Sequence, residues 1–338
     1  MVTIREIAEH TGLSPSTVSI VLNGKAKARN ISEKTAKKIL DTARELGYTP
    51  NISARRLRNN NTKKYVAVFW ANDYRAPLLF EFINGMQKHI EASGMEIEIV
   101  LRLFTPDLLY KFAQPDQLTM YSATVVCTAS KKDLEYIEAT DFASPIVLYN
   151  RFSDKYSNVL VDNEAIGVKV AEIFASHKKK KAVVFTAYSN HYIYSEKRMT
   201  GFMNTFSSTG GTTTVITSPS NRYKTAFETI SEMESIFRNA DCIFCLQDFL
   251  AVSYINYITK TNITDILSSQ EIISIGVHDN DTYDSLLFPP SIIEIPIEAM
   301  GSECMRIVIE KMEGNYSHYE SKTLDFIYAP RSSHTLEK

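Results

Sequence analysis

The stretch that decides the architecture of the N-terminal region is TIREIAEHTGLSPSTVSIVLNG, residues 3–24. Thr3 can cap a first helix, Gly12 permits a tight turn, and Ser14 can cap a second helix. Each helix has about eight residues, which is too short to be stable alone. Two short helices joined by a glycine-containing turn predict a helix-turn-helix unit.

Apolar spacing supports this interpretation. Val18, Val21 and Leu22 recur at the i, i+3, i+4 spacing of one helix face, so we expect them to face a small core. Pro15 suits the first position of that helix, because its missing N–H has no helical partner there. A third helix, capped by Ser32 and ending before a glycine at position 47, is expected to close the core. Its apolar residues are Ile39, Leu40, Ala43 and Leu46.

The chain then passes through a segment of weak helical character. Pro50 and the three asparagines at residues 59–61 mark breaks on either side of it. Residues 51–58 form at most two helical turns, too few for an isolated helix. We therefore predict a DNA-binding domain over residues 1–50 and a hinge helix with linker over residues 51–61.

The net charge of −2 hides an asymmetry along the chain. Residues 1–64 contain 13 lysines and arginines against 5 aspartates and glutamates, a net charge of +8, and the remainder contains 24 against 34, a net charge of −10. A small basic module joined to an acidic body is typical of nucleic-acid binding, because only the module needs to displace counterions from phosphates. An ordinary solvated basic surface is the alternative.

From Tyr65 onwards, strand-like and helix-like segments alternate. This alternation predicts parallel sheets with helices on both faces, in which ligands bind beyond the carboxyl ends of the strands. The length exceeds one ordinary domain, so two lobes are expected. The predicted strands are 66–70, 97–101, 123–127, 146–149, 182–186, 241–246 and 272–277, and the predicted helices are 78–92, 131–140, 163–176, 193–207, 222–238, 248–259 and 297–313.

Several function classes lack their minimal motifs. The sequence contains no GxGxxG, GxxxxGK[ST], GxSxG or HExxH, so we expect no enzyme, no cofactor and no metal site. Cys242 and Cys245 are three residues apart in a predicted strand and would face opposite sides. Together with Cys127 and Cys304 they are expected to be buried thiols. With no long apolar run and charges near the N-terminus, we expect a cytoplasmic, nucleoid-associated protein without membrane contact.

The quoted run, followed by ELGYTPNISARRL at residues 45–57, resembles the lactose/galactose repressor family of bacterial regulators. Five further motifs keep the family's order: PIVLYNR (145–151), VDNEAIG (161–167), RMTGF (198–202), IFCLQDFLA (243–251) and ISIGVHDND (273–281). The resemblance implies a homodimer on a pseudo-palindromic double-stranded operator. It also implies a periplasmic-binding-protein-like, doubly wound effector domain over residues 62–338, with lobes at about 62–161 plus 292–322 and at about 162–291 plus 323–338.

The resemblance implies a set of DNA-binding residues. The second helix would enter the major groove, and Leu57 would form an apolar wedge in the minor groove. Ile20 stands where relatives commonly carry a guanine-reading arginine, so contact with a thymine methyl is the alternative. Lys25 lies in a basic segment that either contacts phosphates or is a solvated loop. The full set is Thr3, Ser14, Pro15, Ser16, Thr17, Ser19, Ile20, Asn23, Lys25, Asn51, Ala54, Arg55 and Leu57.

The resemblance also implies effector-binding residues. Arg198 aligns with an arginine that holds effectors between the lobes, with a surface salt bridge as the alternative. Gln247 follows a strand where relatives use a polar group. His278 replaces an aspartate that accepts hydrogen bonds from sugar hydroxyls, which favours a sugar phosphate or another anion. A sugar that accepts one hydrogen bond from His278 is an alternative, and a purely structural histidine is another. Further residues are expected to form the walls of the pocket, since aromatic faces stack on sugar rings or bases: Trp70, Leu79, Tyr192, Tyr194 and Tyr223. The full set is Trp70, Leu79, Tyr192, Tyr194, Arg198, Tyr223, Gln247 and His278.

The leading hypothesis is therefore a transcription regulator, expected to be a repressor, whose operator affinity depends on a sugar or sugar derivative. A solute-binding protein of the same two-lobed fold is one alternative, although it needs no basic headpiece. A regulator controlled by a phosphoprotein corepressor is another, and an enzyme on a doubly wound fold is a third. A screen of sugars, sugar phosphates and nucleobases for thermal stabilisation would discriminate among effectors.

Overall fold

A computed structural model of the chain describes residues 4–22, 26, 29, 31–46, 63–73, 75, 78–188, 193–276, 283, 285–314 and 318–330. The chain divides into two compact units, Met1–Thr62 and Lys63–Lys338, which we call the headpiece and the two-lobed unit. The predicted hinge helix, residues 51–61, lies outside the described residues.

The headpiece contains the three predicted helices: α1 (Ile4–Thr11), α2 (Pro15–Leu22) and α3 (Glu33–Glu45). Gly12 has a φ of 67°, as expected for the tight turn between α1 and α2. Ser32 caps α3, and its side chain accepts a hydrogen bond from the Thr35 backbone N–H at 3.2 Å. Leu40, by contrast, is exposed instead of lying in the core. The small core consists of Ile7, Ala8, Val18, Val21, Ile39 and Ala43.

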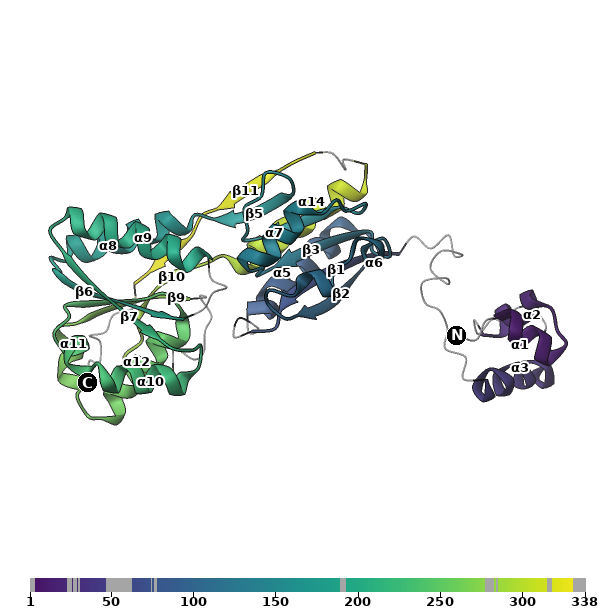
Figure 1. Ribbon diagram of the computed structural model, residues 1–338, viewed down its shortest axis with the longest axis horizontal. Coiled ribbons are helices and arrows are strands. Elements are labelled where there is room, and N and C mark those ends of the chain that lie inside the picture. The colour runs from purple at the N-terminus through teal and green to yellow at the C-terminus, as the bar shows by residue number, and fades with distance from the viewer. Residues whose placement is uncertain are drawn as a thin grey trace. The chain divides into compact units, whose positions relative to one another are not determined.

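The two-lobed unit contains two sheets of six strands each (Figure 1). The first sheet has the order β11-β5-β4-β3-β1-β2 and is entirely parallel. Its strands are β1 (Lys64–Ala71), β2 (Ile97–Phe104), β3 (Ala123–Cys127), β4 (Ile146–Tyr149), β5 (Ser157–Val161) and β11 (Ser321–Leu324).

The second sheet has the order β12-β10-β9-β8-β6-β7 and is parallel except for the β10–β12 pair. This arrangement confirms the predicted fold class. The strands are β6 (Lys181–Ala187), β7 (Thr212–Ser218), β8 (Cys242–Cys245), β9 (Glu271–Gly276), β10 (Ser291–Glu294) and β12 (Ile327–Ala329).

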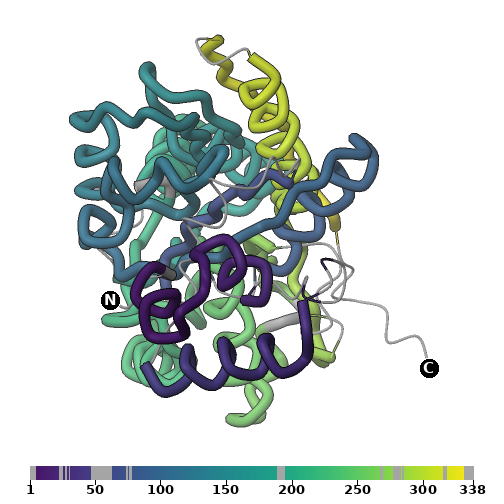
Figure 2. The backbone as a smooth tube through the Cα atoms, turned by 90° about the vertical axis from the view of Figure 1, so that its right-hand side faces the viewer, coloured from purple at the N-terminus to yellow at the C-terminus, as the bar shows by residue number. Residues whose placement is uncertain are grey.

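Helices cover both faces of each sheet. Helices α5 (Leu78–Ser93) and α14 (Ile297–Met312) pack side by side on one face of the first sheet, where α14 is yellow in Figure 2. In the second lobe, α8 (Asn163–Ser176) and α9 (Ile193–Ser208) form the corresponding pair. The opposite faces carry η2 (Leu109–Lys111), α6 (Pro115–Leu118), α7 (Lys131–Ala139), α10 (Tyr223–Glu232), α11 (Glu234–Arg238), α12 (Asp248–Lys260) and η3 (Thr264–Ser268).

Glycines bring the helices of each pair unusually close. A Cβ on Gly85 of α5 would lie 1.8 Å from the Glu298 carbonyl oxygen of α14, and one on Gly167 of α8 would lie 2.0 Å from the Arg198 carbonyl oxygen of α9. Both distances are far below van der Waals contact. Each lobe is therefore built around a helix pair whose backbones touch.

The chain crosses between the sheets three times, after β5, β10 and β11. The first crossing lies where it was expected. The other expected lobe boundaries, about 291/292 and about 322/323, fall inside β10 of the second sheet and at the middle of β11 of the first sheet. The crossings occur after Glu294 and Leu324, where pairing to each sheet ends.

Every strand and helix predicted between residues 65 and 313 is present among the described residues. The ranges 123–127, 146–149 and 163–176 have the predicted ends, and the others differ at one or both ends. The predicted helix at 222–238 is two helices, because the backbone leaves helical geometry at Met233, with φ −108° and ψ 18°. Strands β5, β7, β10, β11 and β12 were not predicted. They are short, or in the case of β7 are rich in threonine at a sheet edge, so no continuous apolar run marks them.

Candidate DNA interface and effector site

The amino end of α2 is organised by Ser14. Its Oγ accepts a hydrogen bond from the backbone N–H of Thr17 at 3.1 Å and lies 2.7 Å from the Ser16 hydroxyl. Pro15 is the first helical residue, as predicted. The cap therefore gathers several exposed hydroxyl groups at the amino end of the helix, where the helix dipole attracts phosphates.

The two faces of α2 differ in exposure. Val18 and Val21 are buried in the headpiece core, which confirms the expectation that they pack there. Ser16 is exposed, and Ile20 is half-buried. The described residues that are predicted to contact DNA therefore lie on the side of α2 away from the core, or at the edge of the core, where bases and phosphates could reach them.

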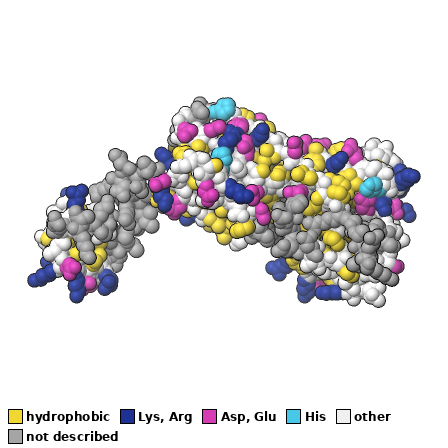
Figure 3. Space-filling model, turned by 180° about the vertical axis from the view of Figure 1, so that it is seen from behind, with side chains coloured by type: hydrophobic (Ala, Val, Ile, Leu, Met, Phe, Trp, Pro, Cys, Tyr) yellow, Lys and Arg dark blue, Asp and Glu magenta, His cyan; other side chains and the backbone are white. Residues whose placement is uncertain are grey.

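Basic side chains are exposed on the headpiece (Figure 3). Lys38 of α3 donates from Nζ to the Thr11 carbonyl oxygen at 2.9 Å and so ties α3 to the end of α1. The other exposed cations of the described headpiece are Arg5, Arg29, Lys34, Lys37 and Arg44. The remaining predicted DNA-binding residues, which lie outside the described residues, are Thr3, Asn23, Lys25, Asn51, Ala54, Arg55 and Leu57.

In the two-lobed unit, Arg198 of α9 lies at the carboxyl end of the second sheet. Its side chain donates from Nε to Asn163 Oδ1 at 2.7 Å and from Nη1 to the Leu246 carbonyl oxygen at 3.5 Å. Arg198 is only 8% exposed. Its burial disfavours the alternative of a salt bridge on a surface helix. That Arg198 holds an effector stays a prediction.

Gln247 lies next to this arginine, as the strand-end prediction requires. It is buried, and its Nε2 donates to Ser195 Oγ at 3.2 Å, one helical turn before Arg198. The amide oxygen of Gln247 has no hydrogen-bond partner among the described residues. A buried acceptor without a donor costs free energy, so a ligand hydroxyl or N–H would be stabilised there.

Two asparagines that the residue-by-residue prediction missed connect the lobes. Asn163, the first residue of α8, donates from Nδ2 to Asn150 Oδ1 at 3.3 Å and to the Val161 carbonyl oxygen at 2.9 Å. Asn150 follows β4 with a left-handed φ of 48°. A polar chain thus runs from Asn150 of the first lobe to Arg198 of the second. Both asparagines lie in quoted motifs, so asking which motif residue follows each strand could have found them.

The first lobe contributes two further arginines at its strand ends, which sequence reasoning also missed. Arg75 pairs with Asp73 and donates to the Thr128 carbonyl oxygen at 3.0 Å. Arg151 is buried and donates from Nη1 to the Asn150 carbonyl oxygen at 2.6 Å. Burial raises the pKa of Tyr149 beside them, and the charges of both arginines partly oppose that shift. The carboxyl ends of the first sheet are therefore rich in guanidinium groups.

Trp70 was expected on the wall of the effector site and is instead in the apolar core. Its side chain has no exposed surface, and its ring lies 5.8 Å from that of Tyr149 and 5.6 Å from that of Phe82. The period-two alternation of β1 directs it toward α5. Its indole N–H has no partner among the described residues.

The other expected wall residues have mixed outcomes. Leu79 is partly buried against the core at the start of α5. Tyr223 is 55% exposed and meets the Phe249 ring edge-on, which places it on the surface at the start of α10. Tyr192, the side chain of Tyr194, and His278 lie outside the described residues.

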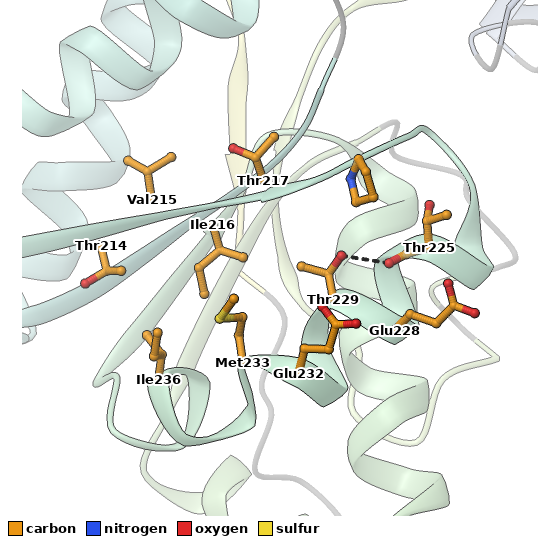
Figure 4. A pocket seen from close by; sticks show the side chains of 11 residues that line it. Thr214, Val215, Ile216, Thr217, Thr225, Glu228, Thr229, Glu232, Met233 and Ile236 are labelled. Atoms are coloured by element: carbon orange, nitrogen blue, oxygen red, sulfur yellow. Dashed lines mark hydrogen bonds between the residues drawn. The ribbon is translucent and has the colours of Figure 1, made fainter.

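A pocket of about 320 Å³ lies elsewhere, between the edge strand β7 and helices α10 and α11 (Figure 4). Ile216, Met233 and Ile236 point into it, and Thr229 donates to the Thr225 carbonyl oxygen at 2.8 Å beside it. None of the predicted effector residues lines this pocket. It is therefore separate from the polar cluster at the strand ends.

Family models account for most of the chain. The model described as "Bacterial regulatory proteins, lacI family" matches residues 3–51, and the one described as "Periplasmic binding proteins and sugar binding domain of LacI family" matches residues 63–324. The first match lies within the headpiece, and the second lies within the two-lobed unit. Among the described residues, no helix is long and apolar enough to cross a membrane.

Individual relatives agree with the family models. The HTH-type transcriptional repressor PurR of Actinobacillus pleuropneumoniae serotype 5b (strain L20) is 23% identical over 333 residues, or 96% of each chain. A LacI family transcription regulator from Clostridium acetobutylicum has a similar structure, with a TM-score of 0.73 and 24% identity over 80% of this chain and 100% of that one. The lac repressor dimer bound to operator and the anti-inducer ONPF has a TM-score of 0.68 and 16% identity over 98% of each chain.

Proposed function

The chain belongs to the lacI family of bacterial regulatory proteins, and from that premise we propose that it binds a pseudo-palindromic operator as a homodimer and represses transcription under the control of a small molecule. The observation that carries the proposal is the headpiece, with its capped α2 and exposed basic residues. A helix of this kind reads base edges in the major groove, while lysines and arginines contact phosphates. The protein would act by binding and not by catalysis.

Exposed apolar residues of the first lobe support the proposed homodimer. Leu101 and Leu103 are 45% and 51% exposed and lie two residues apart on the edge strand β2, so both point to the same side. Phe80 at the start of α5 is also exposed. Monomeric proteins rarely expose large apolar side chains along a sheet edge, as Leu101 and Leu103 are exposed here, because such an edge invites pairing. A second copy would bury it.

For the effector we propose a sugar or sugar derivative that contacts Arg198 and Gln247. The guanidinium supplies only donors and the free amide oxygen only an acceptor, so together they suit a ligand with several hydroxyl groups. The additional arginines at the ends of the first sheet favour derivatives that carry a phosphate or carboxylate. The expectation that His278 contributes to anion binding stays a prediction.

The test begins with operator selection. The full chain should enrich a two-fold symmetric site from random double-stranded DNA, and the site should then serve in mobility-shift assays with sugars and sugar phosphates. Failure to enrich any symmetric site would contradict the proposed operator binding. A compound that raises the melting temperature of the protein and also changes operator affinity would identify the effector.

Arg198→Met should then weaken binding of that effector by about 10-fold to 100-fold, because a hydrogen bond to a charged group contributes about 1.5–3 kcal/mol. Lys197→Met is the matched control, since Lys197 is the exposed neighbour on the same helix. Operator affinity without effector should be unchanged in both variants. Equal effector affinity in the two variants would exclude Arg198 from the site.

A further inference from the structure

A second pocket, of about 270 Å³, lies at the amino ends of β4 and β5. Asn150 and Asn163, which belong to the proposed effector site, follow the carboxyl ends of the same strands. A strand of four residues spans about 13 Å, so the two places are separate. The pocket is lined by Phe142, Ala143, Ser144, Pro145, Ile146, Lys155, Tyr156, Ser157, Lys311, His318 and Tyr319.

Lys311 is the unusual residue of this pocket. It lies in the last turn of α14 and is only 7% exposed. Its Nζ donates to the His318 carbonyl oxygen. An ammonium group carries three donors, and no second acceptor for it is found among the described residues. Burial lowers the pKa of this lysine, as expected for a cation removed from water.

Among the described residues, the charge of Lys311 is only partly compensated: Glu320 raises the pKa of the lysine, but burial lowers it more. No aspartate or glutamate lines the pocket, whereas a second lysine and a histidine do. Lys155 already donates to the Thr140 carbonyl oxygen at 2.9 Å and pairs with Asp141 at 2.7 Å, and Asp141 points into solvent. Glu320 is held by Arg306. A buried cation with one neutral acceptor is costly, and an anion would offset that cost.

The remaining walls are aromatic. The rings of Phe142 and Tyr156 lie 6.0 Å apart, and Tyr319 completes the aromatic side. The Tyr319 hydroxyl donates to the Ser153 carbonyl oxygen at 2.9 Å, and the Tyr156 hydroxyl donates to the Thr140 carbonyl oxygen. Since both hydroxyls already donate elsewhere, the rings provide mainly apolar contact.

We propose that this pocket binds a small organic anion: the carboxylate or phosphate accepts hydrogen bonds from Lys311, and a flat apolar body lies against the aromatic rings. The site differs from the effector site in position and in chemistry, because its cation is a lysine beside aromatic rings and not a guanidinium beside amides. It would give the protein a second small-molecule ligand.

Calorimetric titration of the full chain with phenyl phosphate tests the proposal, since this probe combines both features. Phenol lacks the anion and inorganic phosphate lacks the apolar body, so each should bind at least tenfold more weakly. Saturable binding of phenyl phosphate is the expected result. No binding at millimolar concentration, or equal binding of inorganic phosphate, would overturn the proposal.

Variants locate the bound probe. Lys311→Met should weaken phenyl phosphate binding at least tenfold without lowering the melting temperature, because an apolar side chain replaces a buried charge. Lys322→Met removes an exposed lysine of β11 and should leave binding unchanged. Ala143→Phe, at an exposed lining position, should block the pocket while keeping every charge.

Arg198→Met separates this site from the proposed effector site. If Arg198→Met binds phenyl phosphate with unchanged affinity, while Lys311→Met and Ala143→Phe lose affinity for it, the results support a second ligand-binding pocket. Loss in Arg198→Met with full affinity in Lys311→Met would assign the probe to the effector site and would overturn the inference.

Discussion

The two candidate sites are assembled in different ways. In the headpiece, the described residues that are expected to contact DNA lie within residues 14–20, in one helix and its cap. In the two-lobed unit, the polar cluster brings together residues from both lobes: Asn150, Asn163, Arg198 and Gln247. The headpiece residues are brought together within two helical turns and by the Ser14 cap. The residues of the cluster meet only because the chain crosses between two sheets. Binding of DNA should therefore depend on local structure and binding of effector on tertiary packing.

The largest expected effect comes from separating the two regions. A chain that begins at residue 62 should lose all operator affinity, because the basic module and the reading helix are removed together. The two-lobed unit should still fold, since both its sheets and their cores lie within residues 63–338. Mobility-shift assays measure the loss, and the melting temperature with and without effector is the control. A shifted operator band with the truncated chain would contradict the assignment of DNA binding to the headpiece.

Glycine substitutions sharpen the contrast between local and tertiary effects. Gly85→Ala should destabilise the two-lobed unit by about 3 kcal/mol or more, because its Cβ would meet the Glu298 carbonyl oxygen at 1.8 Å and force α5 and α14 apart. Gly12→Ala should cost the headpiece only about 1–2 kcal/mol, the cost of a left-handed alanine, since nothing lies within 4 Å of its Cβ. Denaturant unfolding of each region measures both values. Equal losses would show that helix contact is not what Gly85 provides.

An effect smaller than that of Gly85→Ala is expected at the hinge, which lies between the two regions in sequence. Leu57→Ala should weaken operator binding by about 2 kcal/mol and leave binding to random DNA nearly unchanged, because an apolar wedge aids bending and neutralises no phosphate. Arg55→Ala is the contrasting variant. It should weaken binding to both DNAs and reduce the slope of log affinity against log salt by about one unit. Salt titrations with both DNAs separate the two roles, and parallel losses for Leu57→Ala would rule out a wedge.

Most of the fold could be predicted because helix caps and hydrophobic period are local signals. Ser14, Pro15 and Ser32 mark helix ends that the structure contains, and every predicted apolar strand lies in one of the two sheets. The edge strand β7 escaped prediction because threonines replace the apolar run there. Leu40 looked like a core residue by composition, yet it faces solvent because the small headpiece core is filled by its neighbours.

The candidate effector site was predictable only in part. Arg198 and Gln247 followed from the resemblance and from the rule that ligands lie beyond strand ends, and the structure places them side by side. Trp70 was expected at the pocket wall because aromatic faces stack on sugar rings, but the pleat of β1 turns its ring into the core. The rule selects an end of a strand, whereas the side on which a residue points depends on register and on what packs against that face.

By itself, then, the sequence determined the helix-turn-helix, the alternation of strands and helices, and the division of charge between headpiece and body, because these depend on residues within a few positions of one another. Tertiary structure alone decided that Asn150 and Asn163 join Arg198, that Gly85 admits the backbone of α14, and that Lys311 is buried at the end of its helix. Each of these depends on segments that lie far apart in the chain and meet only when the sheets and their helices pack.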